Sequence, residues 1–226
     1  MIDIKPPTAA NGPLLLIDIS GYTSFLQSVA EAHQHDPPKD ASVPDAYGMI
    51  SNLLDGIVVR VVPPFTLSKL EGDAVFAYAI DATQVPRGAA MLACLADCYA
   101  EFQDRLASAN LIWTCDCGAC SRLDRLDLKF ILHSGPYVIQ SIAGREELVG
   151  PDVVMAHRLM KNGAAELVGH GAYALITDVA AASLDVPTDG ALSLVETYEH
   201  YSPIQTHVFP LREARPPSIT WSPAPA

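Results

Sequence analysis

Apolar runs and helical stripes alternate along the first part of the chain. Residues 14–19 form a short apolar run after an Asn-Gly-Pro sequence, and a helix-like stretch begins where the run ends, at Ser20-Gly21. This pattern predicts a buried strand, a tight turn and then a helix. Residues 45–62 carry apolar side chains at helical spacing up to Pro63-Pro64, which predicts an amphipathic helix that the prolines end.

Strands, hairpins and helices continue to alternate in the rest of the chain. Two apolar segments flank Glu71-Gly72-Asp73, which is a hairpin turn signal. The predicted elements after residue 62 are strands at 65–69 and 74–80, a helix at 87–106, strands at 126–132 and 137–142 on either side of Ser134-Gly135-Pro136, a short helix at 153–161, and strands at 172–176 and 206–211. Such an order indicates an α+β sandwich with helices on one sheet, and not a doubly wound parallel fold.

Length and loop composition indicate one domain. The chain has 226 residues, and we assign 1–212 to a single domain with loop insertions near 33–44 and 110–125. Residues 213–226 are rich in proline, so we expect a disordered tail there. No apolar run has the length needed to span a bilayer and no secretion signal is visible, so we expect a soluble, cytoplasmic protein.

The charge balance narrows the range of partners. The formal net charge is −12 at pH 7, and a strongly acidic surface argues against nucleic acid or an anionic membrane as the main partner. It does not exclude a nucleotide, because local cations or bound Mg²⁺ can offset the charge of the phosphates.

Two aspartates carry the main chemical signal. Asp18 ends the first predicted strand, and Asp73 lies at the tip of the predicted hairpin. Two-metal phosphoryl chemistry needs paired carboxylates, and Mg²⁺ favours a few carboxylates together with phosphate oxygens. The helix that opens at Gly21, Tyr22 and Thr23 offers backbone N–H groups to a triphosphate. The alternative is that each aspartate serves only its turn or cap.

The cysteines suggest a second, soft metal site. Three of the five cysteines crowd into Cys115, Cys117 and Cys120. Structural zinc needs four nitrogen or sulfur ligands, so the fourth would be a histidine or else Cys94 or Cys98, which we expect near the end of the preceding helix. The alternatives are three free thiols in a loop and two small core residues in the helix.

Four motifs in order give the chain a family resemblance. LIDISGYTSF (16–25) resembles the first metal motif of class III adenylate and guanylate cyclases, and KLEGDA (69–74) resembles the second, in which a lysine stands four residues before the metal-binding aspartate. Residues 128–135 resemble the strand that ends in His-Ser/Thr-Gly, and 149–159 the segment that ends in Ala-x-Arg-Leu. The chain is also similar to a divergent bacterial branch with a Cys-x-Cys-x-x-Cys element before the His-Ser-Gly strand.

The resemblance implies a fold and a metal site. The fold would be α+β, a ferredoxin-like cyclase homology domain with a mixed, mainly antiparallel sheet and helices packed on one face. Asp18, Asp73 and the carbonyl of Ile19 match the ligands of two Mg²⁺ or Mn²⁺ ions. The resemblance also makes His133 a turn residue at a strand end. We expect His157 on a helix surface or a dimer face.

The resemblance also implies the residues that bind and convert the nucleotide. Lys69 matches the lysine that reads adenine, Glu147 falls at the second base-reading position, and Arg158 matches the arginine that stabilises the transition state. The implied reaction converts ATP, or another nucleoside triphosphate, into a 3′,5′-cyclic nucleotide and pyrophosphate, which makes the protein a phosphorus–oxygen lyase. The site would form between two chains of a homodimer, one supplying the carboxylates and the other the lysine and arginine.

Two departures leave more than one function open. Val154 stands where the family places an asparagine, and Pro151 replaces a usual polar residue. Loss of one oriented donor commonly costs about 10²–10³ in rate. The hypotheses are therefore an active cyclase, a degenerate cyclase domain that binds a nucleotide or a partner without turnover, and a small metal-binding α/β protein unrelated to nucleotides.

Overall fold

The fold is built on one mixed sheet. The computed structural model describes residues 6–34, 45–112, 123 and 125–211. Eight strands form the sheet in the order β2-β3-β1-β4-β6-β8-β7, with β5 paired to β4, and β4–β6 is the one parallel pair of the described strands. The strands are β1 (Thr8–Ser20), β2 (Thr66–Glu71), β3 (Ala74–Tyr78), β4 (Asp127–Ile142), β5 (Arg145–Val149), β6 (Tyr173–Thr177), β7 (Leu192–Glu196) and β8 (Ile204–Pro210). The predicted α+β class is confirmed.

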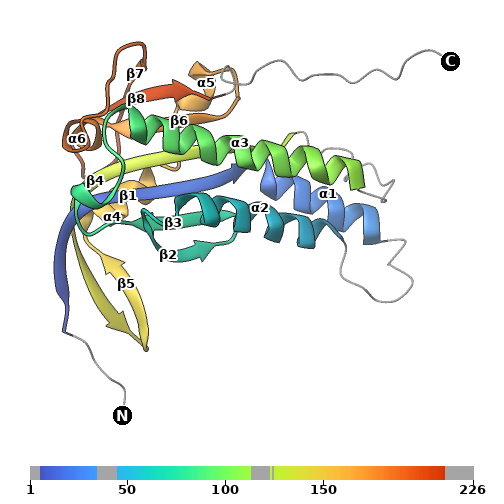
Figure 1. The fold of residues 1–226 in the computed structure, drawn as a ribbon, viewed down its shortest axis with the longest axis horizontal. Helices are drawn as coiled ribbons and strands as arrows, with labels where there is room; N and C mark the ends of the chain where they lie inside the picture. Colours follow the sequence, from blue (N-terminus) through green and yellow to red (C-terminus); the bar gives the residue numbers. More distant parts are fainter. Residues whose placement is uncertain (1–5, 35–44, 113–122, 124, 212–226) are drawn as a thin grey trace.

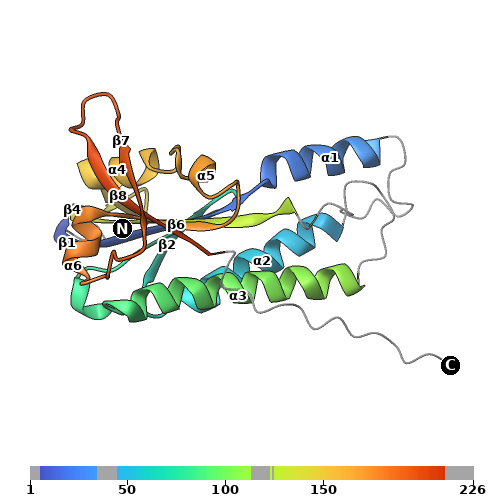
Figure 2. The same cartoon turned by 90° about the horizontal axis from the view of Figure 1, so that it is seen from above.

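Helices lie on both sides of this sheet, and not on one face as the sequence analysis expected. They are α1 (Tyr22–Gln34), α2 (Asp45–Val61), α3 (Ala89–Ile112), α4 (Pro151–Arg158), α5 (Ala164–Leu167) and α6 (Asp178–Ser183), with a 3₁₀ turn η1 (Ala82–Gln84). The long helices α2 and α3 cover one face, and the short helices α4 and α5 lie over the other (Figure 2). No helix in the described ranges is long and apolar enough to cross a membrane.

The alternation of side chains along β1 divides the core between the two faces. Leu15, Ile17 and Ile19 are buried with the residues of α2 and α3, whereas Leu14 and Leu16 are buried with those of α4. Successive side chains of a strand point to opposite faces. Asp18 therefore shares the α4 face of the sheet, and this shared face is what brings it near the residues of α4.

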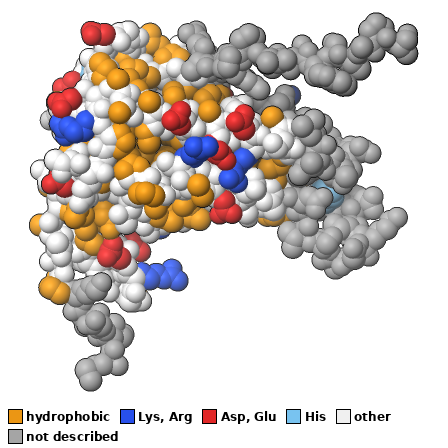
Figure 3. Space-filling model, viewed as in Figure 1, with side chains coloured by type: hydrophobic (Ala, Val, Ile, Leu, Met, Phe, Trp, Pro, Cys, Tyr) orange, Lys and Arg blue, Asp and Glu red, His pale blue; other side chains and the backbone are white. Residues whose placement is uncertain are grey.

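The α2–α3 layer is tied together by charge as well as by apolar contact. Basic and acidic side chains lie close to one another over these helices (Figure 3), where Glu101 pairs with both Arg60 and Arg105. A Cβ at Gly56 would lie 2.5 Å from Nε of Arg105, so the missing side chain lets the arginine cross α2. This layer supports the sheet from the side opposite α4.

Strand β4 is the main difference from the sequence expectation. Residues 126–142 were expected to hold two strands separated at Ser134-Gly135-Pro136, but these residues pair continuously with Pro13, Gly12 and Asn11 of β1. Gly135 serves close approach instead of a turn, because a Cβ there would lie 2.3 Å from Cγ of Asp152. The chain turns later, at Ala143-Gly144, where both φ angles are positive.

The turn at Ala143-Gly144 creates a hairpin that the sequence did not reveal. Strands β4 and β5 extend away from the body as an arm, together with the start of β1 (Figure 1). The Tyr78 hydroxyl donates to Oε1 of Glu146 at 2.6 Å, which ties the start of β5, near the turn, to β3. Other elements absent from the prediction are β7, α5 and α6, while α3 continues to Ile112, beyond its expected end.

Candidate functional site

The first part of the site is a pair of aspartates on neighbouring strands. Asp18 is opposite Ala74 in the β1–β3 ladder, and the backbone N–H of Ile19 donates to the carbonyl of Asp73 at 3.3 Å. Burial and then the negative charge of Asp18 raise the pKa of the Asp73 carboxyl, although its own backbone hydrogen bond and Lys129 act to lower it. The two predicted metal ligands thus lie within electrostatic reach of each other.

A lysine that the sequence analysis missed completes this group. Lys129 is the direct cross-strand partner of Asp18 on β4, and its Nζ lies 2.9 Å from Oδ2 of Asp18. Nζ also donates to the carbonyl of Met160 at 3.4 Å. We call Asp18, Asp73 and Lys129 the carboxylate edge. The signal was available, because a charged residue inside an otherwise apolar strand is expected to have a partner.

The start of α1 lies beside the carboxylate edge. Gly21 has a φ of +86°, a left-handed conformation that favours glycine, and its carbonyl accepts the N–H of Phe25 at 3.0 Å. Burial and then the charge of Asp73 raise the pKa of Tyr22, which places the phenol near that carboxylate. Thr23 is exposed. The predicted triphosphate turn and the predicted metal ligands are therefore neighbours.

The oxygens at this edge suit a hard cation. Carboxylates and a backbone carbonyl are the ligands that Mg²⁺ and Mn²⁺ favour, and both ions commonly take their remaining ligands from water and phosphate. Asp18, Asp73 and the carbonyl of Ile19 fit this description. The part of the chain that the structure describes contains no group of three or more His, Cys, Asp or Glu residues able to hold a metal, so phosphate or water oxygens would complete the coordination.

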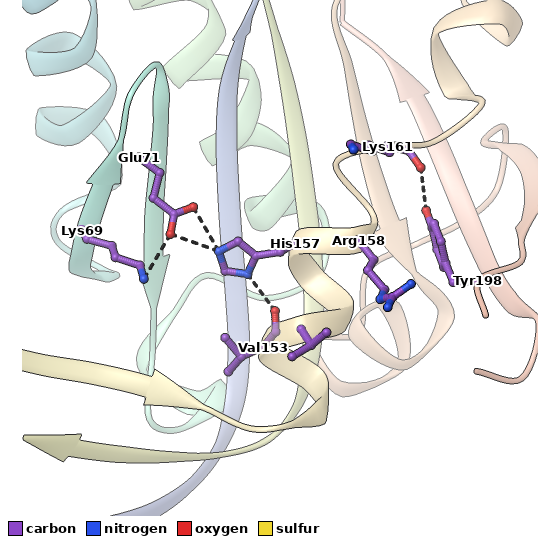
Figure 4. Close-up of a pocket in the computed structure, with 8 residues that line it drawn as sticks. Lys69, Glu71, Val153, His157, Arg158, Lys161 and Tyr198 are labelled. Atoms are coloured by element: carbon purple, nitrogen blue, oxygen red, sulfur yellow. Dashed lines mark hydrogen bonds and ion pairs between the residues drawn. The ribbon is translucent and has the colours of Figure 1, made fainter. Parts of the chain in front are cut away.

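The second part of the site is a pocket of about 680 Å³ beside α4 (Figure 4). We call it the α4 pocket, and its lining residues are Lys69, Glu71, Val153, Val154, His157, Arg158, Lys161 and Tyr198. Basic side chains predominate in the lining, in a protein whose net charge is −12. This local excess of positive charge favours an anionic ligand.

Lys69 connects the α4 pocket to the arm. Its Nζ lies 3.1 Å from Oε1 of Glu71 and 3.3 Å from Oε2 of Glu147. Burial acts to lower the pKa of Lys69, but hydrogen bonds to Glu71 and Glu147 outweigh it, so the pKa is raised and the lysine is charged at neutral pH. The structure thus brings the two predicted base-reading residues together.

His157 lines the α4 pocket and lies against the β2–β3 hairpin. Nδ1 is 2.8 Å from the carbonyl of Val153, and Nε2 is 3.1 Å from Oε2 of Glu71. Its ring meets Phe76 edge-on, with centroids 4.8 Å apart. Both ring nitrogens therefore face oxygens that accept hydrogen bonds, one of a carbonyl and one of a carboxylate. His157 therefore joins α4 to the β2–β3 hairpin.

Arg158 and Lys161 provide cations without a fixed counter-charge. Within the described part of the chain, neither forms a salt bridge. The guanidinium carbon of Arg158 lies 5.5 Å from the ring centroid of Tyr201, a cation–π geometry. The Tyr198 hydroxyl donates to the carbonyl of Lys161 at 2.9 Å. The predicted transition-state arginine is held over an aromatic ring while its charge is free for a ligand.

The two residues that depart from the cyclase motifs, Val154 and Pro151, both lie on α4. Val154 is 48% exposed and contributes an apolar wall to the α4 pocket. Pro151 is the first residue of α4, where its missing N–H has no helical partner to lose. A hydrogen-bonding side chain is thus absent at position 154, as the sequence indicated.

His133 anchors the start of α4 from inside the core. Its Nε2 lies 3.0 Å from Oδ1 of Asp152, and Nδ1 lies 3.0 Å from Oγ1 of Thr177, which accepts the N–H of Ala180. Burial lowers the pKa of His133 despite the neighbouring Asp152, which favours the neutral ring. The order of side chains resembles a nucleophile triad, but Thr177 is fully buried, so the group serves structure. His133 is not a strand-end turn residue, because β4 continues past it.

The structure describes only two of the five cysteines of the predicted zinc site, Cys94 and Cys98. Cys115, Cys117 and Cys120 lie outside the described residues. Cys98 is fully buried, and burial raises the pKa of its thiol to about 12, which disfavours the thiolate that zinc needs. Helix α3 continues for about four turns beyond Cys98, so neither Cys98 nor Cys94 lies near its end as expected. The zinc site stays a prediction.

The fold is that of nucleotide cyclase catalytic domains. The adenylyl cyclase CyaB from P. aeruginosa superposes with a TM-score of 0.61 at 13% identity, covering 91% of this chain and 96% of that chain. The guanylyl cyclase Cya2 gives 0.57 at 13% identity, covering 90% and 93%. A rhodopsin-guanylyl cyclase core with converted specificity, in complex with ATPalphaS, gives 0.53 at 15% identity, covering 90% and 97%. Identities this low establish the fold alone.

Sequence comparison identifies the family. The chain belongs to the family described as "Protein of unknown function (DUF2652)", which matches residues 50–167. The "Uncharacterized protein Rv2561/Rv2562" of Mycobacterium tuberculosis is 31% identical over 167 residues, which cover 72% of this chain and 74% of that protein. The family match spans Asp73, Arg158 and the α4 pocket up to Lys161, whereas Asp18 lies before it.

Proposed function

We propose that this protein binds a nucleoside triphosphate with divalent metal ions and converts it, at a homodimer interface, into a 3′,5′-cyclic nucleotide and pyrophosphate. The observation that carries the proposal is the placement of two complementary groups on one face of a cyclase-type sheet. The carboxylate edge offers oxygens to a cation, and the α4 pocket offers cations to an anion. Neither group alone requires a nucleotide, but a metal–triphosphate complex satisfies both.

Each residue has a stated task in this proposal. Asp18, Asp73 and the carbonyl of Ile19 would hold Mg²⁺ or Mn²⁺, which when bound lowers the pKa of a hydroxyl and offsets phosphate charge. Lys69 and Glu147 present a donor and an acceptor side by side, which suits the edge of a base. Arg158 would meet the charge that develops on the phosphate as pyrophosphate leaves.

The proposed homodimer pairs these two groups across its interface. In the proposed arrangement, the carboxylate edge of one chain faces the α4 pocket of its partner, which gives two composite sites. Val154, which lines the α4 pocket, exposes 48% of an apolar side chain that a partner would cover.

A second candidate is a domain that binds the nucleotide and does not turn it over. Val154 favours this alternative, because a valine cannot hydrogen-bond ribose or orient the attacking hydroxyl. The Lys129–Asp18 ion pair favours it as well, because the lysine engages an oxygen of a metal ligand. Such a protein would act through its ligand-bound state as a regulatory module.

A product assay separates the candidates. Purified protein is incubated with each nucleoside triphosphate and Mn²⁺, and cyclic product is measured by mass spectrometry. We expect product that disappears with Asp73→Ala and persists with Arg145→Ala, an exposed arginine of the arm. Product that survives Asp73→Ala rules out the assigned site, whereas nucleotide binding without product supports the second candidate. Light scattering after size exclusion tests the dimer.

A further inference from the structure

Lys129 has a geometry that the proposed reaction does not account for. It stands directly opposite Asp18 in the β1–β4 ladder, and its Nζ lies 2.9 Å from Oδ2 of Asp18. The lysine and aspartate side chains are only 22% and 16% exposed. Both strands are held by backbone hydrogen bonds, so the contact is fixed by register and not by a chance meeting of long surface side chains.

A second contact holds the ammonium group in place. Nζ donates to the carbonyl of Met160, 3.4 Å away, in the segment that follows α4. The ammonium group is therefore held against Asp18, one of the two carboxylates that would share a cation.

We infer that Lys129 supplies one of the two positive centres of the carboxylate edge, so that each chain takes one divalent cation there and not two. This inference rests on the proposed function, because it concerns the same carboxylates. With Oδ2 of Asp18 engaged by Lys129, Oδ1 is left to share a metal with Asp73. With one divalent ion bound, the positive charges of this ion and of Lys129 outweigh the two carboxylates, so a second ion meets net repulsion.

Lys129 is then a positioning and specificity residue with a direct binding signature. Its removal opens Oδ2 of Asp18 and removes a positive charge, so a second ion should enter and the first should bind about tenfold more tightly. Replacement by arginine keeps the charge and should preserve the single ion. The reaction itself need not be measured, because stoichiometry reports the effect.

The experiment is a Mn²⁺ titration of the full chain, with free Mn²⁺ followed by its electron paramagnetic resonance signal. Binding that is lost in the Asp18→Asn, Asp73→Asn double variant is assigned to the carboxylate edge. We expect one such ion in the wild type and in Lys129→Arg, and two in Lys129→Met. Arg87→Met is the matched control, because it removes one charge from a pair with Asp185 that involves none of these residues.

The outcomes separate the inference from the proposed function. Two ions per wild-type chain at the carboxylate edge overturn the inference, whether or not Lys129→Met folds, and leave the proposed function intact. If folded Lys129→Met binds the same number of Mn²⁺ ions as the wild type with the same affinity, the inference is likewise overturned and the proposed function stands. The absence of Mn²⁺ binding in every variant overturns both.

Discussion

The carboxylate edge and the α4 pocket lie on the same face of the sheet but are held in different ways. At the edge, the backbone ladder sets the positions of Asp18 and Lys129, because the two residues are paired in register. In the pocket, long side chains meet across gaps between elements, as Lys69 meets Glu147 and His157 meets Glu71. The fold therefore dictates the half of the site that is proposed to bind metal, whereas the half that would read the nucleotide depends on side-chain pairs that substitution can alter.

The largest expected effect is a loss of stability when the packing under the α4 pocket is disrupted. It shows whether this packing and the carboxylate edge are independent of each other. Phe76 is 1% exposed and touches the His157 ring. Phe76→Ala should cost about 3–5 kcal/mol of stability, which lowers the melting temperature by roughly 10 °C. We expect Mn²⁺ binding at the carboxylate edge to persist below the new melting temperature. If Phe76→Ala loses Mn²⁺ binding as well as stability, the α4 pocket and the carboxylate edge form one cooperative unit.

The two aspartates of the edge should respond to neutralisation in opposite directions. Asp18→Asn leaves Lys129 without its partner and should cost about 1–3 kcal/mol. Asp73→Asn removes a carboxylate whose pKa is raised above its ordinary value of 3.8, so it should raise the melting temperature at pH 7. Thermal unfolding of the two variants tests both expectations. If the melting temperature shifts in the same direction in both variants, the environments described for Asp18 and Asp73 are wrong.

The pH dependence of the Asp73 contribution follows from the same raised pKa. Between the raised pKa and 3.8, the folded protein holds a proton that the unfolded chain has released, so this part of the stability increases as the pH falls. The effect should be present in the wild type and absent in Asp73→Asn. The comparison is made as the difference between the two melting curves over pH, which removes the contributions of other groups.

The sequence predicted the local parts of the fold well, and the reason is physical. The strand–turn–helix around Gly21, the hairpin around Gly72 and the helix that ends before Pro63 each rest on signals within a few residues. The same local signals located Asp18 and Asp73, because strand ends and hairpin tips are set by nearby backbone chemistry.

What the sequence did not reveal depends on residues far apart in the chain. Gly135 was assigned to a turn because its real role, room for Asp152, is visible only once α4 packs on β4. Lys129 was missed because its partner lies on another strand. The contact between His157 and Glu71 was not foreseen, because the two residues are 86 positions apart. Short elements such as α5 and β7 carry too few residues for a period to show.

A smaller effect separates the charge of the α4 pocket from that of the carboxylate edge. Arg158→Ala should weaken binding of ATP by about tenfold, because a charge-assisted contact to phosphate is lost. It should leave Mn²⁺ binding in the absence of nucleotide unchanged. Arg145→Ala, at the exposed arm, is the control of equal charge. The affinity of each variant for ATP is measured by calorimetry. An equal loss of affinity in the two variants would mean that the overall charge of the protein, and not the α4 pocket, determines ATP binding.

The smallest expected effect concerns how Arg158 is held ready. Its guanidinium lies over the Tyr201 ring, and such a contact is worth about 0.5–1 kcal/mol at an exposed site. Tyr201→Leu should therefore weaken ATP binding by roughly two- to fivefold, because Arg158 loses the surface that orients it. Tyr201→Phe keeps the ring and should bind ATP like the wild type, although it loses a 3.5 Å hydrogen bond to Pro151. If Tyr201→Phe and Tyr201→Leu weaken ATP binding equally, the hydroxyl and not the ring positions Arg158. The α4 pocket would then depend on hydrogen bonds at its rim, just as the carboxylate edge depends on the backbone hydrogen bonds between β1 and β4.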